Sequence, residues 1–322
     1  MRRAVLPWLV VGALAVAIGF GVVLGLNATV FGSAGFVRVY LEAVARGDAR
    51  GALSMPGVAA DPDARADFLV DAALGGPDAL QEVAVERRPD GTEEVTFAWR
   101  TGTTVGASTF TVERIGTRLG LFPEWGFVAS PVATVDLTIA HDERFDLNGV
   151  AAETGIGAAA PVSYAVLAPG VYRLDHHSTY LEAAAVDVVV DLAPPRVSAS
   201  LDVQASPALL TQITTEVHDY LRECATQEVL FPTGCPLGHA IANRVVSTPA
   251  WSIAEYPELT VGPGPEFGTW LVPSADVVSH LRVDVQSLFD GTVSTFDEDL
   301  PLTVSYVVTI QADDRTLRIV PQ

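Results

Sequence analysis

The chain has 322 residues, of which 49% are hydrophobic and 18% are charged, so it is long enough for two or three domains. It carries 39 acidic residues against 19 basic ones, all of them arginine, and its formal net charge is -20. This acidic balance argues against a nucleic-acid partner and against a polybasic contact with a membrane surface.

The first feature along the chain is an uncharged apolar run at residues 4–26, preceded by Arg2 and Arg3. About 20 apolar residues suffice to cross a bilayer, and the positive-inside rule makes residues 1–3 a cytoplasmic stub. The alternative is a signal peptide cut near Gly32, but the run is longer than the usual hydrophobic region of such peptides. We therefore expect a single-pass transmembrane helix in the cell membrane, with the bulk of the chain extracytoplasmic.

Residues 33–128 are predicted to form an α+β module. Apolar residues recur at helical spacing in FVRVYLEAVA, and Gly47 ends this helix. A second helix is predicted from Asp61, as its N-cap, to Gly75. The strand EEVTFAWRT follows and places three apolar side chains on one face, namely Val95, Phe97 and Trp99. That face carries no titratable group, which argues against catalysis in this module.

Residues 130–193 are predicted to form a small β-sandwich module. Short β-rich runs such as ATVDLTIA, PVSYAVL and AVDVVVDL are separated by turn signals at Asn148-Gly149 and Pro169-Gly170. The segment LAPPR after the last run is interpreted as a stiff linker.

Residues 197–322 return to a helix followed by an antiparallel sheet. One face of the predicted helix is formed by Leu210, Ile213, Val217, Tyr220, Leu221 and Cys224. In DVVSHLRVDVQSLF apolar and polar residues alternate, which is typical of a sheet with one face in water.

The two cysteines of the chain, Cys224 and Cys235, are interpreted as a disulfide pair. With His218 and His239 they also form a Cys₂His₂ ligand set, but the spacing lacks the short cysteine knuckle of zinc sites. A redox pair would need C-x-x-C with a thiolate at a helix N-terminus, whereas Cys224 is expected at a helix C-terminus. A structural disulfide needs only an even cysteine count and an oxidising compartment.

A weak candidate ligand cleft is predicted in the last module from its aromatic residues, Tyr220, Trp251, Tyr256 and Trp270. The alternative is that these residues belong to the core of a small domain. Neighbouring histidines such as His176 and His177 point to opposite faces of a strand and cannot share one ion. We find no nucleophile–base or metal-ligand constellation, and therefore predict no catalytic residue, no metal and no cofactor.

Two stretches resemble known extracytoplasmic modules. FVRVYLEAVARGDARGAL resembles the opening helix of cystatin-like cone domains, and APVSYAVLAPGVYRL resembles the PEGA-type β-module. The order of anchor, cone, β-module and cone is similar to that of the teicoplanin-resistance-associated envelope proteins. It also resembles a group of actinobacterial membrane proteins that share a C…P-x-G-C-P loop and the strand W-S-I-x-x-Y-P, here Trp251 to Pro257.

The sequence thus predicts a fold of the α+β and β classes: a transmembrane helix, a cystatin-like α+β module, a small β-sandwich and a second helix-plus-sheet module. We expect a non-enzymatic, membrane-anchored protein that binds, senses or scaffolds in the cell envelope. Its expected partners are the membrane, through one helix, and an envelope protein or cell-wall ligand. The alternatives are a cone-fold enzyme acting on a small envelope ligand and a passive structural spacer.

Overall fold

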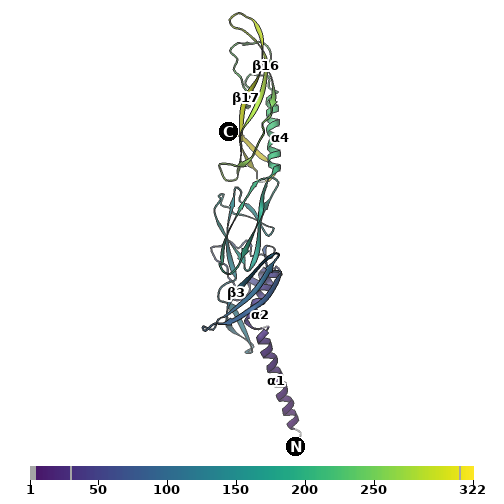
Figure 1. The fold of residues 1–322 in the computed structure, drawn as a ribbon, viewed down its shortest axis with the longest axis vertical. Helices are drawn as coiled ribbons and strands as arrows, with labels where there is room; N and C mark the ends of the chain where they lie inside the picture. Colours follow the sequence, from purple (N-terminus) through teal and green to yellow (C-terminus); the bar gives the residue numbers. More distant parts are fainter. Residues whose placement is uncertain (1–4, 30, 312) are drawn as a thin grey trace.

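The computed structural model describes residues 5–29, 31–311 and 313–322. The helix α1 (Val5–Thr29) stands at one end of an elongated molecule, and three groups of strands follow it end to end (Figure 1). The described residues contain eighteen strands and four α-helices. The predicted balance of α+β and β modules behind a transmembrane helix is therefore wrong, because the chain is mostly β-sheet.

The predicted membrane anchor is not supported. The apolar run does lie in α1, while the predicted stub at 1–3 lies outside the described residues. A crossing needs about 20 consecutive apolar residues in one helix. Within the described part of the chain, no helix meets the requirements of length and apolar character together. An uncharged run predicts a helix but does not by itself make a span, so the single-pass anchor and the membrane localisation derived from it are corrected.

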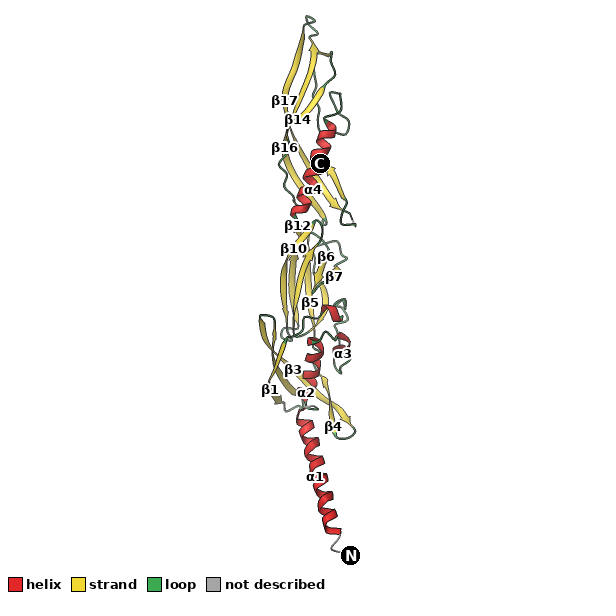
Figure 2. Ribbon diagram, turned by 90° about the vertical axis from the view of Figure 1, so that its right-hand side faces the viewer, coloured by secondary structure: helices red, strands yellow, loops and turns green. Residues whose placement is uncertain are grey.

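The first group of strands forms an antiparallel sheet in the order β1-β2-β3-β4, with α2 packed on one face (Figure 2). Its elements are α2 (Ser33–Ala45), α3 (Ala49–Leu53), β1 (Ala79–Arg87), β2 (Glu93–Thr101), β3 (Thr104–Arg118) and β4 (Phe122–Phe127). Val37, Tyr40 and Leu41 recur on one face of α2 and are buried. They meet the inward side chains of the sheet, among them Phe97 and Phe110, in one core.

The predicted helix from Asp61 to Gly75 does not form. Only the single 3₁₀ turn η1 (Asp71–Ala73) lies there. Arg65 instead forms an isolated parallel bridge with Tyr164, and the Phe68 ring is fully buried in the core of the middle strands. Tertiary packing has overridden the local capping signals, because the segment lies against the next module.

The middle strands form two packed sheets. One has the order β12-β10-β9-β6-β7 and the other β11-β5-β8. The strands are β5 (Val132–Ala140), β6 (Arg144–Leu147), β7 (Val150–Glu153), β8 (Val162–Leu167), β9 (Gly170–His177), β10 (Leu181–Val190), β11 (Arg196–Asp202) and β12 (Gln204–Ala205). The parallel pair β11–β5 and the short pair β12–β10 show that residues 196–205, beyond the predicted linker, complete these sheets.

The last group is a long hairpin covered by one helix. β16 (Thr269–Gln286) and β17 (Val293–Ile310) pair antiparallel, and α4 (Pro207–Cys224) lies against them (Figure 1). Shorter strands complete the sheet, namely β13 (Arg244–Val245), β14 (Ala250–Glu255), β15 (Gly262–Pro263) and β18 (Leu317–Pro321). On α4 the buried side chains follow the helical period: Leu209, Ile213, Val217, Leu221 and Cys224. Four of these belong to the predicted face, whereas Leu209 was not predicted, and Leu210 and Tyr220 are only half-buried.

The middle and last groups share one continuous apolar core, which runs from Phe68 to Val308. Polar contacts reinforce their junction. Arg144 forms an ion pair with Asp314 at 3.2 Å, and the Asp314 carboxylate accepts from the Thr179 N–H at 2.9 Å. The two groups are therefore held in a fixed relation by buried apolar area as well as by charge.

Candidate functional site

The four aromatic residues of the predicted cleft do not come together. Trp270 is 1% exposed and lies in the core shared with the middle module. Trp251 packs in a separate cluster with Cys224, and its indole N–H donates to the Val229 carbonyl at 2.8 Å. Tyr256 lies at the surface against His218, with ring centroids 4.5 Å apart. Only Tyr220 lines a cavity.

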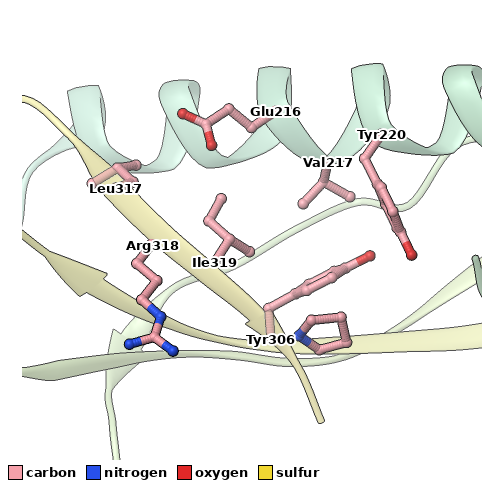
Figure 3. Close-up of a pocket in the computed structure, with 8 residues that line it drawn as sticks. Glu216, Val217, Tyr220, Tyr306, Leu317, Arg318 and Ile319 are labelled. Carbon is pink, nitrogen blue, oxygen red and sulfur yellow. The ribbon is translucent and has the colours of Figure 1, made fainter. Parts of the chain in front are cut away.

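That cavity is part of a hollow between α4 and the end of the sheet, which we call the tyrosine cleft (Figure 3). A first space of about 410 Å³ lies between α4 and β18 and is lined by Glu216, Val217, Tyr220, Tyr306, Leu317, Arg318, Ile319 and Pro321. A second space of about 460 Å³ is lined by Tyr220, Gly234, Cys235, Pro236, Thr303, Val304, Ser305, Tyr306, Pro321 and Gln322. Three residues line both spaces, namely Tyr220, Tyr306 and Pro321.

The two tyrosines approach the cleft from opposite walls. Tyr220 comes from α4 and Tyr306 from β17, and their hydroxyl ends point toward the same part of the cavity (Figure 3). The Tyr220 hydroxyl donates to the Gly234 carbonyl at 2.6 Å. Tyr306 is 3% exposed as a whole residue, and among the residues that the structure describes its hydroxyl has no hydrogen-bond partner. The hydroxyl oxygen is not among the fully buried unpaired atoms of the described residues, so it faces the open space of the cleft.

Burial keeps both phenols protonated. It raises the pKa of Tyr306 to about 12, with a smaller contribution from Tyr220, and it also raises the pKa of Tyr220. Desolvation disfavours the charged phenolate. At neutral pH both groups therefore act as neutral hydrogen-bond donors and acceptors, and neither is prepared to act as a base.

The charges of the first space lie at its rim. Glu216 lies on α4, and its carboxylate accepts a hydrogen bond from the Gln212 side-chain amide at 2.9 Å. Arg318 lies on β18 and its guanidinium points away from α4 (Figure 3). In the described ranges Arg318 forms no ion pair. The cleft thus offers an apolar floor, two phenols and two charges of opposite sign.

The cysteine loop forms one wall of the second space. The sulfur atoms of Cys224 and Cys235 lie 2.00 Å apart, which is the pairing expected from the sequence. Gln227 ties the loop together, since its side chain accepts from the Thr233 N–H and donates to the Thr233 carbonyl. The two histidines of the alternative zinc set lie apart: His218 stacks on Tyr256 and His239 on Phe296.

One buried titratable group lies far from the cleft. His176, on β9, is 6% exposed, and neither ring nitrogen has a hydrogen-bond partner within the described residues. Burial lowers its pKa, and the surrounding charges of Asp142, Arg144 and Asp314 modify this effect. His176 is therefore neutral at neutral pH. Its ring lies within the influence of the Arg144 and Asp314 charges at the junction.

Sequence reasoning missed Tyr306 and the cleft itself. Tyr306 alternates along β17 with Val304 and Val308, all facing inward, so its pattern is that of a core residue. Nothing in that pattern shows that β18 ends beside it and leaves space. The one sequence signal for a cleft at this position was a tyrosine on an inward face whose neighbouring residues are valines.

Comparisons with known proteins do not identify the chain. No protein-family model matches it, and neither the curated proteins nor the solved structures contain a significant match. The resemblance to teicoplanin-resistance-associated envelope proteins therefore stays a prediction.

Proposed function

We propose that this chain is a non-enzymatic binding protein whose ligand occupies the tyrosine cleft. The observation that carries the proposal is the Tyr306 hydroxyl, which lacks a hydrogen-bond partner within the described structure and is directed into an accessible cavity. Because it faces the open space of the cleft, this hydroxyl gives a ligand a directed hydrogen-bond partner, and no bond within the described structure has to break first.

The size and lining of the cleft support binding. Its two spaces, of about 410 and 460 Å³, each fall in the range of known small-molecule sites. Apolar side chains such as Val217, Leu317 and Ile319 supply contact area, while the two phenols supply direction. Few polar groups on an apolar floor are the usual composition of such sites.

The same residues do not favour catalysis. General acid–base chemistry needs a group whose pKa lies near the working pH. The pKa of each tyrosine is raised, and burial is the main cause. The remaining titratable groups of the first space are Glu216 and Arg318. The residues that line this space include no histidine, serine or cysteine beside them. We therefore keep the prediction that the protein has no catalytic residue.

A second candidate function is a structural spacer. It is favoured by the end-to-end arrangement of the three groups of strands and by the core that the last two share (Figure 2). A spacer needs length and stiffness but no cavity. The two functions are compatible, because a stiff rod can hold a binding module at its end.

Solvent mapping tests the binding proposal. Crystals of the full chain would be soaked separately in isopropanol, acetamide and phenol, and the bound solvent molecules located. We expect the three probes to overlap between Tyr220 and Tyr306, with a polar atom at the Tyr306 hydroxyl. Probes that cluster elsewhere and leave the cleft to ordinary water would overturn the proposal and favour the spacer.

A further inference from the structure

One edge of β17 is open over most of its length. β16 pairs with β17 from Val293 to Thr309, whereas β18 pairs only with residues 306–310. The last bond on the β18 side runs from the Gln322 N–H to the Ser305 carbonyl at 3.0 Å. Among the described strands none pairs with this edge at residues 293–304. An open edge is a template for pairing with another chain.

Some backbone N–H and carbonyl groups of β17 point toward this open edge. Backbone groups of an antiparallel strand alternate between its two edges. Because the Ser305 carbonyl faces the β18 side, the N–H and carbonyl of Thr303 face it as well. A strand that continued the line of β18 would therefore find the N–H and carbonyl of Thr303 in position, whereas Pro301, which faces the same side, offers only its carbonyl.

The open edge leads into the tyrosine cleft. Thr303, Val304 and Ser305 line its second space, opposite residues 234–236 of the cysteine loop. An extended chain lying along this edge would pass beneath the loop, and one of its side chains would enter the space between Tyr220 and Tyr306. The Tyr306 hydroxyl, which lines the same space and lacks a described partner, supports this placement independently of the edge, because it can bond a group on that side chain.

The charge of the edge indicates the charge of that occupant. β17 carries Asp297, Glu298 and Asp299 and no lysine or arginine. His280 contacts Asp297 and Asp299, and Arg282 lies 3.6 Å from Asp297, so these two acids are partly compensated. Glu298 forms no ion pair in the described part of the chain. The strand is therefore complementary to a basic partner and repels an acidic one.

From these observations we infer that the ligand is an extended, positively charged peptide segment that adds as a strand to residues 293–305 of β17 and places a side chain in the tyrosine cleft. Strand addition of this kind takes affinity from main-chain hydrogen bonds and specificity from pockets for alternate side chains. The inference rests on the proposed function, since it names the ligand class of the same cleft.

The probe is the synthetic peptide Ac-KVKVKVKVK-NH2, titrated into the full chain by calorimetry. Its alternation puts lysines on the face of Asp297 and Asp299, where they compete with His280 and Arg282, and valines on the face of the cleft, which Glu298 shares. Two control peptides separate the causes: one replaces every lysine with glutamate, and the other carries N-methyl groups on alternate residues. N-methylation removes donors of the β-ladder while the charge stays the same.

A matched pair of protein variants targets the edge. Thr303→Pro removes the N–H that faces the open side, and Thr303→Val keeps it. We expect the proline variant to weaken binding by about tenfold and the valine variant to bind as wild type. Thermal melting of both variants checks that they are folded. If the proline variant does not fold, the N-methylated peptide tests the same hydrogen bonds from the other side.

The supporting result is binding of the lysine peptide, loss of binding on N-methylation and slower amide hydrogen exchange at residues 293–305. Equal binding of the N-methylated peptide would show a contact by charge alone and overturn the inference. No binding of the lysine peptide would also overturn it. In that case solvent probes that still occupy the cleft would leave the proposed function standing, whereas an empty cleft would remove both.

Discussion

The first and last modules both place a helix on an antiparallel sheet. In the last, a cavity reaches Val217 and Tyr220 of α4, whereas in the first the pocket beside the helix lies at the start of α2, at Ser33 and Ala34. Under α2 the space is filled by aromatic rings, and Tyr40 lies there fully buried between Phe110 and Phe127. Under α4 the corresponding space contains Tyr306 beside a cavity. The same arrangement thus serves for stability in one module and leaves room for a ligand in the other.

The two tyrosines show the difference most clearly. The Tyr40 hydroxyl lies 2.8 Å from the Ala168 carbonyl and 3.0 Å from the Pro131 carbonyl, so its proton is satisfied within the protein. Burial raises the pKa of both Tyr40 and Tyr306. Only Tyr306 lacks a described partner. The fold therefore supplies partners for the Tyr40 hydroxyl, while the Tyr306 hydroxyl stays available to the cleft.

The largest expected effect comes from emptying the filled core. Phe110→Ala should lower the free energy of unfolding by about 3–5 kcal/mol, because it leaves a cavity among close-packed rings. Ile319→Ala in the cleft should cost about 1 kcal/mol or less, because its side chain is half-buried beside existing space. Urea denaturation of both variants measures the difference. Equal costs would show that the two modules are packed alike.

The next largest effect concerns the cysteine loop that walls the cleft. The double variant Cys224→Ser/Cys235→Ser should lose about 3 kcal/mol, since the bridge closes a short loop in the unfolded chain. The melting transition of the last module should fall while that of the first is unchanged. Intact mass after alkylation, with and without reductant, checks the bond itself. Two alkylated thiols in the unreduced protein would contradict it.

A smaller effect is expected from pH. Burial lowers the pKa of His176 in the folded protein, so below the unfolded value of about 6.5 the unfolded chain binds more protons. Stability should therefore be complete above that pH and fall as the pH decreases toward the lowered pKa. The variant His176→Leu should lose this dependence.

His280 serves as a control, because its pKa is shifted in the opposite direction and its effect on stability should depend on pH in the opposite way. The hydrogen bonds that His280 donates to the Asp299 and Asp297 carboxylates raise its pKa, so its contribution is present at acid pH and is lost as the pH rises through the raised value. His280→Gln should remove that loss and leave the decrease at low pH. Melting temperatures across the acid range test both histidines. An unchanged acid profile in His176→Leu would show that this histidine is hydrated in the folded state.

Local patterns predicted the parts of the fold that depend on one element at a time. The helical period of Leu209 to Cys224 and the alternation of β16 follow from burial of one face. The segment from Asp61 to Gly75 was mispredicted because its contacts are with Ser163, Tyr164 and Val171, far along the chain. Local capping residues carry no information on such contacts.

The cleft depended on similar long-range information. Tyr220 was identified because it is an aromatic residue on a helix face, and it does line the cavity. Trp251 and Trp270 share that composition but are core residues. Tyr220 differs from these two residues because it lies beside the end of β18, where the cavity is. The position of that end is set by the pairing of Pro321 with Tyr306 of β17.

The comparison of Tyr40→Phe with Tyr306→Phe tests the central claim most directly. Each substitution removes one hydroxyl and leaves the ring, and the free energy of unfolding is measured by urea denaturation followed in each module. Tyr40→Phe should cost about 1–3 kcal/mol, because the Ala168 carbonyl loses its hydroxyl donor and the Pro131 carbonyl keeps only the Ala168 N–H. Tyr306→Phe should change stability by less than about 0.5 kcal/mol, since no described partner is lost. A cost for Tyr306→Phe equal to that for Tyr40→Phe would show that its hydroxyl is bonded within the protein and that the cleft is closed.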